Sequence, residues 1–387
     1  MHLSPRIKNV AASTTLAITA KAKELKTQGF DVVNFAGGEP DFDTPDFIKE
    51  AAVTAIQNGF TKYTPSTGTP ELKQAIIEKF KKDNHLDYSP AQIVVSCGAK
   101  HCLFNLIQAL VDTGDEVIVP APYWVSYPEM VKIAGGVARI VQTQAANSFK
   151  LTPEAFLKNI SAKTKVLVLN SPSNPTGVLY PRKDLEDIAA ICVKKNIFVI
   201  SDEIYEKLIY DNAQFTAIAS LGKDIYNLTA TVNGVSKTYS MTGWRIGYFG
   251  APKELAECVK NFQDHTTSNP TSISQMAAMA ALKASEESVR AMRAEFEKRR
   301  NLMLAELDKI PGLKCIRPQG AFYVFVDISA LKMSSDEVAQ RVLNEINVAL
   351  IPGSGFGADN YIRLSFSTSQ DRIQEGLKRI GGWIKAL

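Results

Sequence analysis

Short apolar runs alternate with helical patterns through the middle of the chain, and this alternation constrains the fold more than any other feature. The strand-like runs are residues 93–96, 116–119, 165–170 and 197–202. Four consecutive apolar residues at 166–169 are typical of a strand covered on both faces. Between the runs, apolar residues recur at helical spacing, as at 103–111. We therefore expect an α/β domain with a mostly parallel sheet at about residues 44–285.

The pattern changes in the last third of the chain. A helical stretch covers about 272–309, and further strand-like and helical segments follow it. The strands are expected at 321–326, 348–351 and 361–366, and the helices at 336–346 and 370–384. We expect a smaller α+β domain made of residues 12–43 and 286–387, with residues 1–11 as an N-terminal arm. Because no linker rich in Pro or Gly separates the domains, they should pack closely.

Composition excludes several classes of function. The 44 Lys and Arg against 40 Asp and Glu leave a net charge of +4, without a basic cluster that would suit nucleic acid. The five cysteines include no Cys-x-x-Cys pair, which favours reduced thiols in a cytoplasmic compartment. The four isolated histidines predict no metal site. No apolar run approaches the roughly 20 residues of a membrane span, and the N-terminus lacks the apolar core of a secretion signal.

The segment at 233–247 is the most informative about chemistry. Lys237 follows Ser236 in a Gly-x-Ser turn, and Arg245 comes eight residues later within Gly-Trp-Arg-Ile-Gly. A lysine after such a turn is more often a surface residue. An arginine between apolar neighbours, however, is expected to be buried, and a buried guanidinium needs an anion. A lysine that forms a Schiff base with a carbonyl cofactor, beside a serine and an arginine that hold its phosphate, explains all three residues.

A second candidate site lies where the strand at 197–202 ends. Asp202 is its last residue, and Tyr205 follows three positions later. Open α/β sheets bind ligands at the carboxyl ends of their strands. An aspartate there could keep a pyridine nitrogen protonated, since raising its pKa by two units requires about 2.7 kcal/mol. A carboxylate at ~4 Å provides about 4 kcal/mol at an effective dielectric constant of ~20. The alternative, an aspartate that caps a helix, is about as common.

Two further segments could complete a cofactor site. Prolines at 172 and 175 fix a turn that holds Asn174, although such a turn is often only a rigid surface loop. Gly98 and Ala99 join a strand to a helix, where backbone N–H groups can approach a phosphate. Trp124, just after the next strand, offers a ring that can stack on a flat cofactor.

Together these segments resemble the class I aminotransferases, which are pyridoxal-phosphate enzymes of fold type I, and among them the aspartate aminotransferase branch found widely in bacteria. The resemblance covers essentially the whole chain, because matching motifs recur in order from one end to the other. Besides the segments above, these motifs are Gly-Gly-Glu-Pro-Asp-Phe at 37–42, Thr-Lys-Tyr at 61–63, Pro-Gln-Gly-Ala-Phe-Tyr at 318–323 and Ile-Arg-Leu-Ser at 362–365.

The resemblance implies a role for each candidate that would face the cofactor ring. Lys237 corresponds to the lysine that binds pyridoxal 5'-phosphate and moves the substrate proton. Asp202 corresponds to the partner of the pyridine nitrogen. Tyr205 and Asn174 correspond to the residues that contact the phenolic oxygen, and Trp124 to the stacking ring.

The same resemblance implies a phosphate site shared between two subunits. Gly98, Ala99, Ser236 and Arg245 match the residues around the phosphate. Tyr63 matches a tyrosine that reaches the phosphate of the neighbouring subunit's cofactor. The resemblance therefore implies a homodimer with shared active sites.

The substrate site shows one departure from a familiar pattern. Arg363 matches the arginine that binds the substrate α-carboxylate as a bidentate fork, with Gly38 and Asn174 beside it. Animal and enteric aspartate aminotransferases bind the second carboxylate with an arginine shortly before a Ser-Asn-Pro turn. Here the turn is at 268–270, and no arginine stands in the eight residues before it. In the branch that this chain resembles, a lysine at the position of Lys100 takes that role.

The resemblance predicts transfer of the amino group of L-aspartate to 2-oxoglutarate by a ping-pong mechanism. A dual aspartate/prephenate aminotransferase is the nearest alternative: Thr15 and Lys100 fit it as substrate-binding residues, whereas Ala-Ala at 11–12 replaces the Lys-Pro of many such members. An aromatic aminotransferase or an amino-acid lyase would use the same cofactor site. A binding protein without turnover would not need the complete catalytic set.

Overall fold

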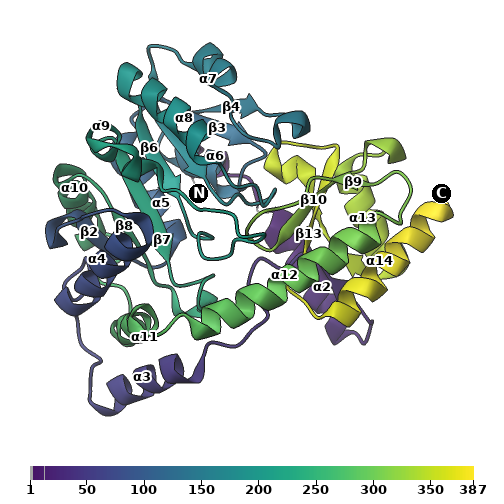
Figure 1. The fold of residues 1–387 in the computed structure, drawn as a ribbon, viewed down its shortest axis with the longest axis horizontal. Coiled ribbons are helices and arrows are strands. Elements are labelled where there is room, and N and C mark those ends of the chain that lie inside the picture. The colour runs from purple at the N-terminus through teal and green to yellow at the C-terminus, as the bar shows by residue number, and fades with distance from the viewer. Residues whose placement is uncertain (1–2, 13) are drawn as a thin grey trace.

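The structure, a computed structural model, describes residues 3–12 and 14–387. Within these residues seven strands form the larger sheet, in the order β2-β8-β7-β6-β5-β3-β4 (Figure 1). Their bounds are β2 Ile93–Ser96, β3 Glu116–Ala121, β4 Val137–Gln142, β5 Thr164–Asn170, β6 Phe198–Asp202, β7 Thr229–Gly234 and β8 Gly247–Gly250. Only β8 runs antiparallel to its neighbours, β2 and β7. The prediction of a mostly parallel sheet is confirmed.

Helices cover both faces of this sheet, as the apolar run at 166–169 predicts. Val166 and Val168 of β5 pack in one core with helices α5, α6 and α10. Leu167 and Leu169 alternate with them and pack in another core with α7, α8 and α9. The helices are α5 Ala99–Leu110, α6 Ser126–Ile133, α7 Pro153–Asn159, α8 Arg182–Lys195, α9 Lys223–Tyr226 and α10 Lys253–Asp264.

The second part of the described chain contains two smaller sheets. Strands β12, β13, β10 and β9 form an antiparallel sheet, and β1 pairs in parallel with β11. The strands are β1 Val33–Asn34, β9 Lys314–Cys315, β10 Tyr323–Asp327, β11 Val348–Ala349, β12 Ile351–Pro352 and β13 Tyr361–Ser365. Val33 and Phe35 share a core with residues after 290, so the N-terminal segment packs on the C-terminal part. The domain boundaries at 43/44 and 285/286 stay a prediction.

Two expected elements are divided in the structure. The helical stretch at 272–309 forms two helices, α11 Ser272–Lys283 and α12 Glu287–Leu307. Between them Ala284 has extended backbone angles that end α11, and Glu286 forms ion pairs with Lys82 and Lys207. The run at 348–351 also divides, because β11 and β12 belong to different sheets. The other helices are α1 Pro5–Lys8, α2 Thr14–Thr27, α3 Asp46–Gln57, α4 Pro70–Asn84, α13 Ser335–Ile346 and α14 Gln370–Lys385.

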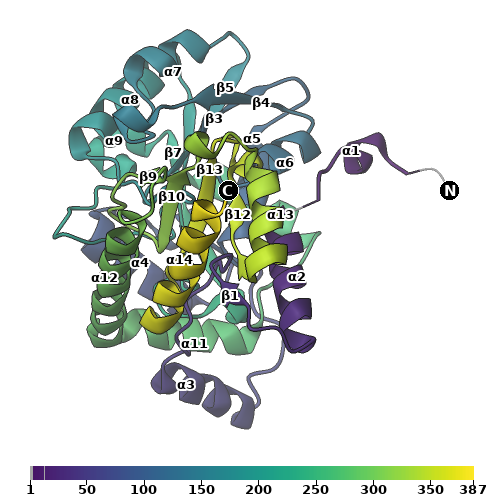
Figure 2. The ribbon, with the colours of Figure 1, turned by 90° about the vertical axis from the view of Figure 1, so that its right-hand side faces the viewer.

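The two ends of the chain lie differently on the molecule. Figure 2 shows α1 projecting away from the rest of the chain, while α14 packs along the smaller sheets. After α1, the Ala11 amide donates a hydrogen bond of 3.0 Å to Glu129 Oε2 of α6. No helix of the described residues is long and apolar enough to cross a membrane.

Candidate active site

A cavity of about 470 Å³ lies at the carboxyl ends of β2, β3, β5, β6 and β7. Residues of the larger sheet line one side, and residues near β1, β10 and β13 line the other. The predicted site residues on this cavity are Thr15, Gly38, Ala99, Lys100, Trp124, Asn174, Asp202, Tyr205, Ser236, Lys237, Arg245 and Arg363. The structure thus brings together side chains that are up to 348 positions apart (15 to 363) in the sequence.

Lys237 extends from the turn after β7 into this cavity. Its Nζ donates a hydrogen bond of 2.5 Å to the Gly38 carbonyl oxygen on the opposite wall. Burial lowers the pKa of Lys237 to about 8, with Arg363 and Arg245 acting in the same direction and Glu39 and Asp202 opposing them. An amine with this pKa is partly unprotonated near neutral pH, as a nucleophile or general base must be.

Asp202 is fully enclosed at the end of β6. Tyr127 donates a hydrogen bond of 2.6 Å to Asp202 Oδ2, and the Ile204 amide donates to Oδ1 at 3.3 Å. Burial raises the pKa of Asp202 to about 6, although the Tyr127 hydrogen bond and the charge of Lys237 lower it. The carboxylate would therefore gain from a cationic partner in the cavity. A turn follows β6, so the alternative role of Asp202 as a helix cap is excluded.

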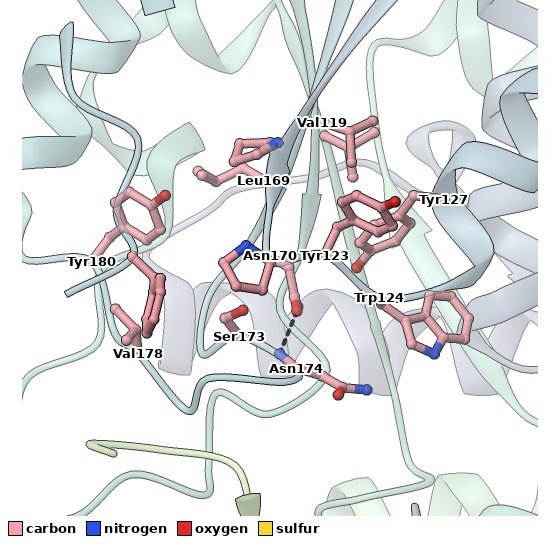
Figure 3. Close-up of a pocket in the computed structure, with 14 residues that line it drawn as sticks. Val119, Tyr123, Trp124, Tyr127, Leu169, Asn170, Ser173, Asn174, Val178 and Tyr180 are labelled. Carbon is pink, nitrogen blue, oxygen red and sulfur yellow. Dashed lines mark hydrogen bonds between the residues drawn. The ribbon is translucent and has the colours of Figure 1, made fainter. Parts of the chain in front are cut away.

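Tyr205 and Asn174 lie where β6 and β5 continue into the cavity wall. The hydroxyl groups of Tyr205 and Tyr323 are 3.0 Å apart and share a hydrogen bond. The backbone N–H of Asn174 donates a hydrogen bond of 2.8 Å to Asn170 Oδ1, which fixes the turn after β5 (Figure 3). The Asn174 side chain is then free to accept from Arg363 Nη1 at 3.0 Å.

At the start of α5, glycines and backbone N–H groups leave space for an anion. Gly98 has a positive φ of 93°, and a side chain there would meet the Arg245 guanidinium at 2.4 Å. A Cβ on Gly247 would lie 2.1 Å from the Ala99 amide nitrogen. No described side chain caps α5, so its first N–H groups can receive an anion. Ser236 lines the cavity nearby.

The expectation that Arg245 is buried is wrong. Its side chain is exposed in the single chain and donates to the carbonyl oxygens of Thr242 at 2.9 Å and Cys97 at 3.2 Å. Its backbone has a left-handed φ of 57°, between the half-buried Trp244 and the buried Ile246. The guanidinium still borders the cavity beside Gly98.

Arg363 is buried on the opposite wall, on β13. Its Nη2 donates to the Ala36 carbonyl oxygen at 3.0 Å, and its guanidinium lies 4.2 Å from the centre of the Tyr323 ring. Its Nε has no acceptor among the described residues. Burial lowers the pKa of this group, so an anion in the cavity would stabilise its charge.

Lys100 and Trp124 form the end of the cavity near α5. The Lys100 Nζ lies 4.8 Å from the centre of the Trp124 ring, a cation–π contact. Burial and the neighbouring Arg245 lower the pKa of Lys100. Thr15, on α2, borders the same space. Tyr63, in contrast, lies outside the cavity and is 91% exposed in the single chain.

Tyr127 and Tyr323 were not among the site residues expected from the sequence. Tyr127 lies at the start of α6, and its ring packs edge to face on Trp124 with the ring centres 5.3 Å apart. Tyr323 ends the 318–323 motif, and it contacts both Tyr205 and Arg363. The motif could have identified Tyr323, whereas no sequence signal links Tyr127 to Asp202.

Comparison with known proteins identifies the family. Residues 31–380 match the model of the aminotransferases of class I and II. The chain belongs to this family. An aspartate aminotransferase of Bacillus sp. strain YM-2 is 50% identical over 99% of both chains. A probable aspartate/prephenate aminotransferase of Aquifex aeolicus is 47% identical over 98% of this chain and 97% of its own. The solved aspartate aminotransferase of Thermus thermophilus with maleate is 43% identical, covers 99% of both chains and superposes with a TM-score of 0.95.

The residues of this aminotransferase fit the cofactor that the family implies, pyridoxal 5'-phosphate. The cavity has a lysine amine, an enclosed carboxylate that would gain from a cation, and an uncapped helix start beside an arginine. The amine suits the aldehyde of the cofactor, and the carboxylate suits its pyridine nitrogen. The helix start and the arginine suit its phosphate. Among the described residues no group of three or more potential ligands could hold a metal ion.

Proposed function

We propose that this aminotransferase transfers the amino group of L-aspartate to 2-oxoglutarate, giving oxaloacetate and L-glutamate. It uses pyridoxal phosphate held at Lys237 and works as a cytoplasmic homodimer. One observation carries the substrate assignment: besides Arg245 next to Gly98, the cavity that contains Lys237 is bordered by two cationic side chains, Arg363 and Lys100, whose pKa values burial lowers. A dicarboxylic substrate supplies an anion to each. The aspartate aminotransferases among its relatives and the maleate in the Thermus structure support the same assignment.

The geometry of the site supports a role for each of these residues. Bound pyridoxal phosphate supplies an electron-accepting ring that stabilises a carbanion at the substrate Cα. Lys237 would hold the cofactor covalently, and its amine, once released, would serve as the base that takes the proton from the substrate Cα. Asp202 keeps the pyridine nitrogen protonated, and Tyr127 holds the Asp202 carboxylate in place. Tyr205 donates to the phenolic oxygen of the cofactor.

Other residues would bind and orient the ligands. The amides of Ala99 and Lys100, Gly98, Ser236 and Arg245 bind the phosphate. Trp124 and Asn174 contact the cofactor ring. Arg363 binds the α-carboxylate with its fork, and Gly38 and Thr15 border the substrate.

A substrate panel tests this function. The purified holoenzyme is assayed with 2-oxoglutarate and each amino donor in turn, and then with prephenate as amino acceptor. We expect aspartate to have the highest kcat/KM and parallel double-reciprocal plots, as ping-pong kinetics require. Aromatic donors preferred over aspartate would overturn the proposal. Efficient amination of prephenate would establish the dual activity that the name of the Aquifex relative suggests.

Tyr63→Phe should weaken cofactor binding although Tyr63 lies outside the cavity of its own chain. If its hydroxyl donates to the phosphate of the neighbouring subunit, its loss should raise the Kd of pyridoxal phosphate by roughly 10- to 100-fold. Titration of the apoprotein by absorbance measures the Kd. Light scattering on the same samples gives the oligomeric state. A fully active monomer, or an unchanged Kd in a dimer, would contradict the shared site.

A further inference from the structure

The turn that carries Asp202 and Tyr205 also carries two buried glutamates. Asp202, Ile204 and Tyr205 line the cavity. Glu203 lies between Asp202 and Ile204, and Glu206 follows Tyr205. The two glutamates are 1% and 4% exposed. Burying a carboxyl group is unfavourable unless it is hydrogen-bonded, and neither glutamate belongs to the proposed chemistry. Their partners therefore have to explain their presence.

Those partners lie on α4, more than 100 positions earlier in the chain. Asn84 Nδ2 donates to Glu203 Oε2 at 2.9 Å and to Glu206 Oε2 at 2.6 Å. Lys79 donates to Asn84 Oδ1 at 2.5 Å and forms an ion pair with Glu206. We call Lys79, Asn84, Glu203 and Glu206 the α4 anchor. A single amide of the α4 anchor thus connects both glutamates of the turn.

Because the α4 anchor buries charged groups, its stability depends on the hydrogen bonds between its members. It has two carboxyl groups and one ammonium group, all buried. Burial raises the pKa of Glu203 well above its usual range, and the neighbouring Glu206 adds to this. Ser201 donates to Glu203 Oε1 at 2.9 Å. Without Asn84, two carboxyl oxygens would face each other in the interior with no shared donor.

Backbone hydrogen bonds tie the start of this turn to β7, and its side chains tie it to α4. Residues 203–206 belong to no helix or strand. The Glu203 amide donates to the Val232 carbonyl oxygen at 2.9 Å, and the Glu206 amide donates to the Glu203 carbonyl oxygen at 3.0 Å. Since Glu203 follows Asp202 and Glu206 follows Tyr205, the α4 anchor holds the chain next to each cofactor-facing residue.

We propose that Asn84 and Lys79 are positioning residues for the reaction: through Glu203 and Glu206 they fix the turn that presents Asp202 and Tyr205 to the cofactor. This inference rests on the proposed function. A displaced turn weakens the bonds from Asp202 to the ring nitrogen and from Tyr205 to the phenolic oxygen. Both bonds favour loss of the proton from the linkage between Lys237 and the cofactor, so the midpoint pH of that proton loss should rise.

Asn84→Ala in the full-length holoenzyme tests the proposal. We expect the midpoint pH of the visible absorbance change of bound cofactor to rise by about half a unit or more. The Kd of pyridoxal phosphate should rise about tenfold. The kcat should fall while the KM for aspartate stays within about twofold, because Arg363 and Lys100 are untouched. If Asn84→Ala does not fold, Glu203→Gln and Glu203→Ala replace it, and glutamine should retain more of the wild-type midpoint than alanine.

Tyr88→Phe is the matched control. It removes a buried hydrogen bond of 3.0 Å to Thr231 Oγ1 near α4 and keeps every hydrogen bond of the α4 anchor. It should lower Tm and leave the midpoint pH unchanged. Midpoint pH and Kd are measured well below Tm. If Asn84→Ala lowers Tm but keeps the wild-type midpoint and Kd, the positioning role is overturned while the proposed function stands. A wild-type protein that takes up no pyridoxal phosphate would overturn the proposed function, and this inference with it.

Discussion

Lys237→Ala should yield a folded protein that binds pyridoxal phosphate without a covalent link and transaminates roughly 10⁴-fold more slowly or worse. The loss is large because one amine holds the cofactor and also moves the substrate proton. Folding should survive, since the Lys237 side chain makes a hydrogen bond to Gly38 across a cavity and does not fill a packed core. Cofactor should still bind at the start of α5 with Ser236 and Arg245.

Borohydride reduction followed by peptide mass analysis measures the covalent link. In the wild type the reduced cofactor should lie on Lys237, and the visible absorbance before reduction should bleach when L-aspartate is added. Lys253→Ala, at an exposed lysine of α10, is the control and should behave as the wild type. Cofactor fixed to any other lysine, or a colourless wild-type protein that ignores added pyridoxal phosphate, would refute the assignment.

The larger sheet could be predicted from sequence because its strands are buried on both faces. The run at 166–169 has no polar residue, so burial follows from composition alone, and β5 lies where the strand was expected. Shorter strands were harder to predict from the sequence. Residues 348–351 read as one strand, yet β11 pairs with the N-terminal β1 and β12 with β13. A local pattern does not contain the identity of a distant partner strand.

The candidate site shows the same limit. Strand ends and a helix start located Asp202, Asn174 and Gly98, since these positions follow from the course of the chain. Arg245 was expected to be buried because its neighbours are apolar, but its backbone is left-handed and its side chain is exposed in the single chain. The bonds from Tyr127 to Asp202 and from Asn84 to the two glutamates join elements far apart in sequence. Such contacts depend on how elements pack, which spacing along the chain does not record.

Lys100→Ala should lower kcat/KM more for substrates that have a second carboxylate than for substrates that lack one. Lys100 and Arg363 border the same cavity, and burial lowers the pKa of both, so each would gain from a substrate carboxylate. Removing one partner of a buried charge pair costs ~2–5 kcal/mol, a factor on the order of tens to thousands. We expect kcat/KM for aspartate and glutamate to fall by that factor. Alanine and phenylalanine, which have no second carboxylate, should be affected much less.

Two further variants distinguish charge from packing at this position. Lys100→Arg keeps the charge and should retain more activity toward aspartate than Lys100→Ala. Lys100→Met keeps an unbranched chain over the Trp124 ring without the charge, so it should resemble Lys100→Ala toward aspartate while binding pyridoxal phosphate normally. Equal losses for dicarboxylic and monocarboxylic substrates would mean that Lys100 supports the cofactor or the fold. In that case the second carboxylate would bind elsewhere, and the assignment of aspartate as substrate would no longer rest on the two cationic walls of the cavity.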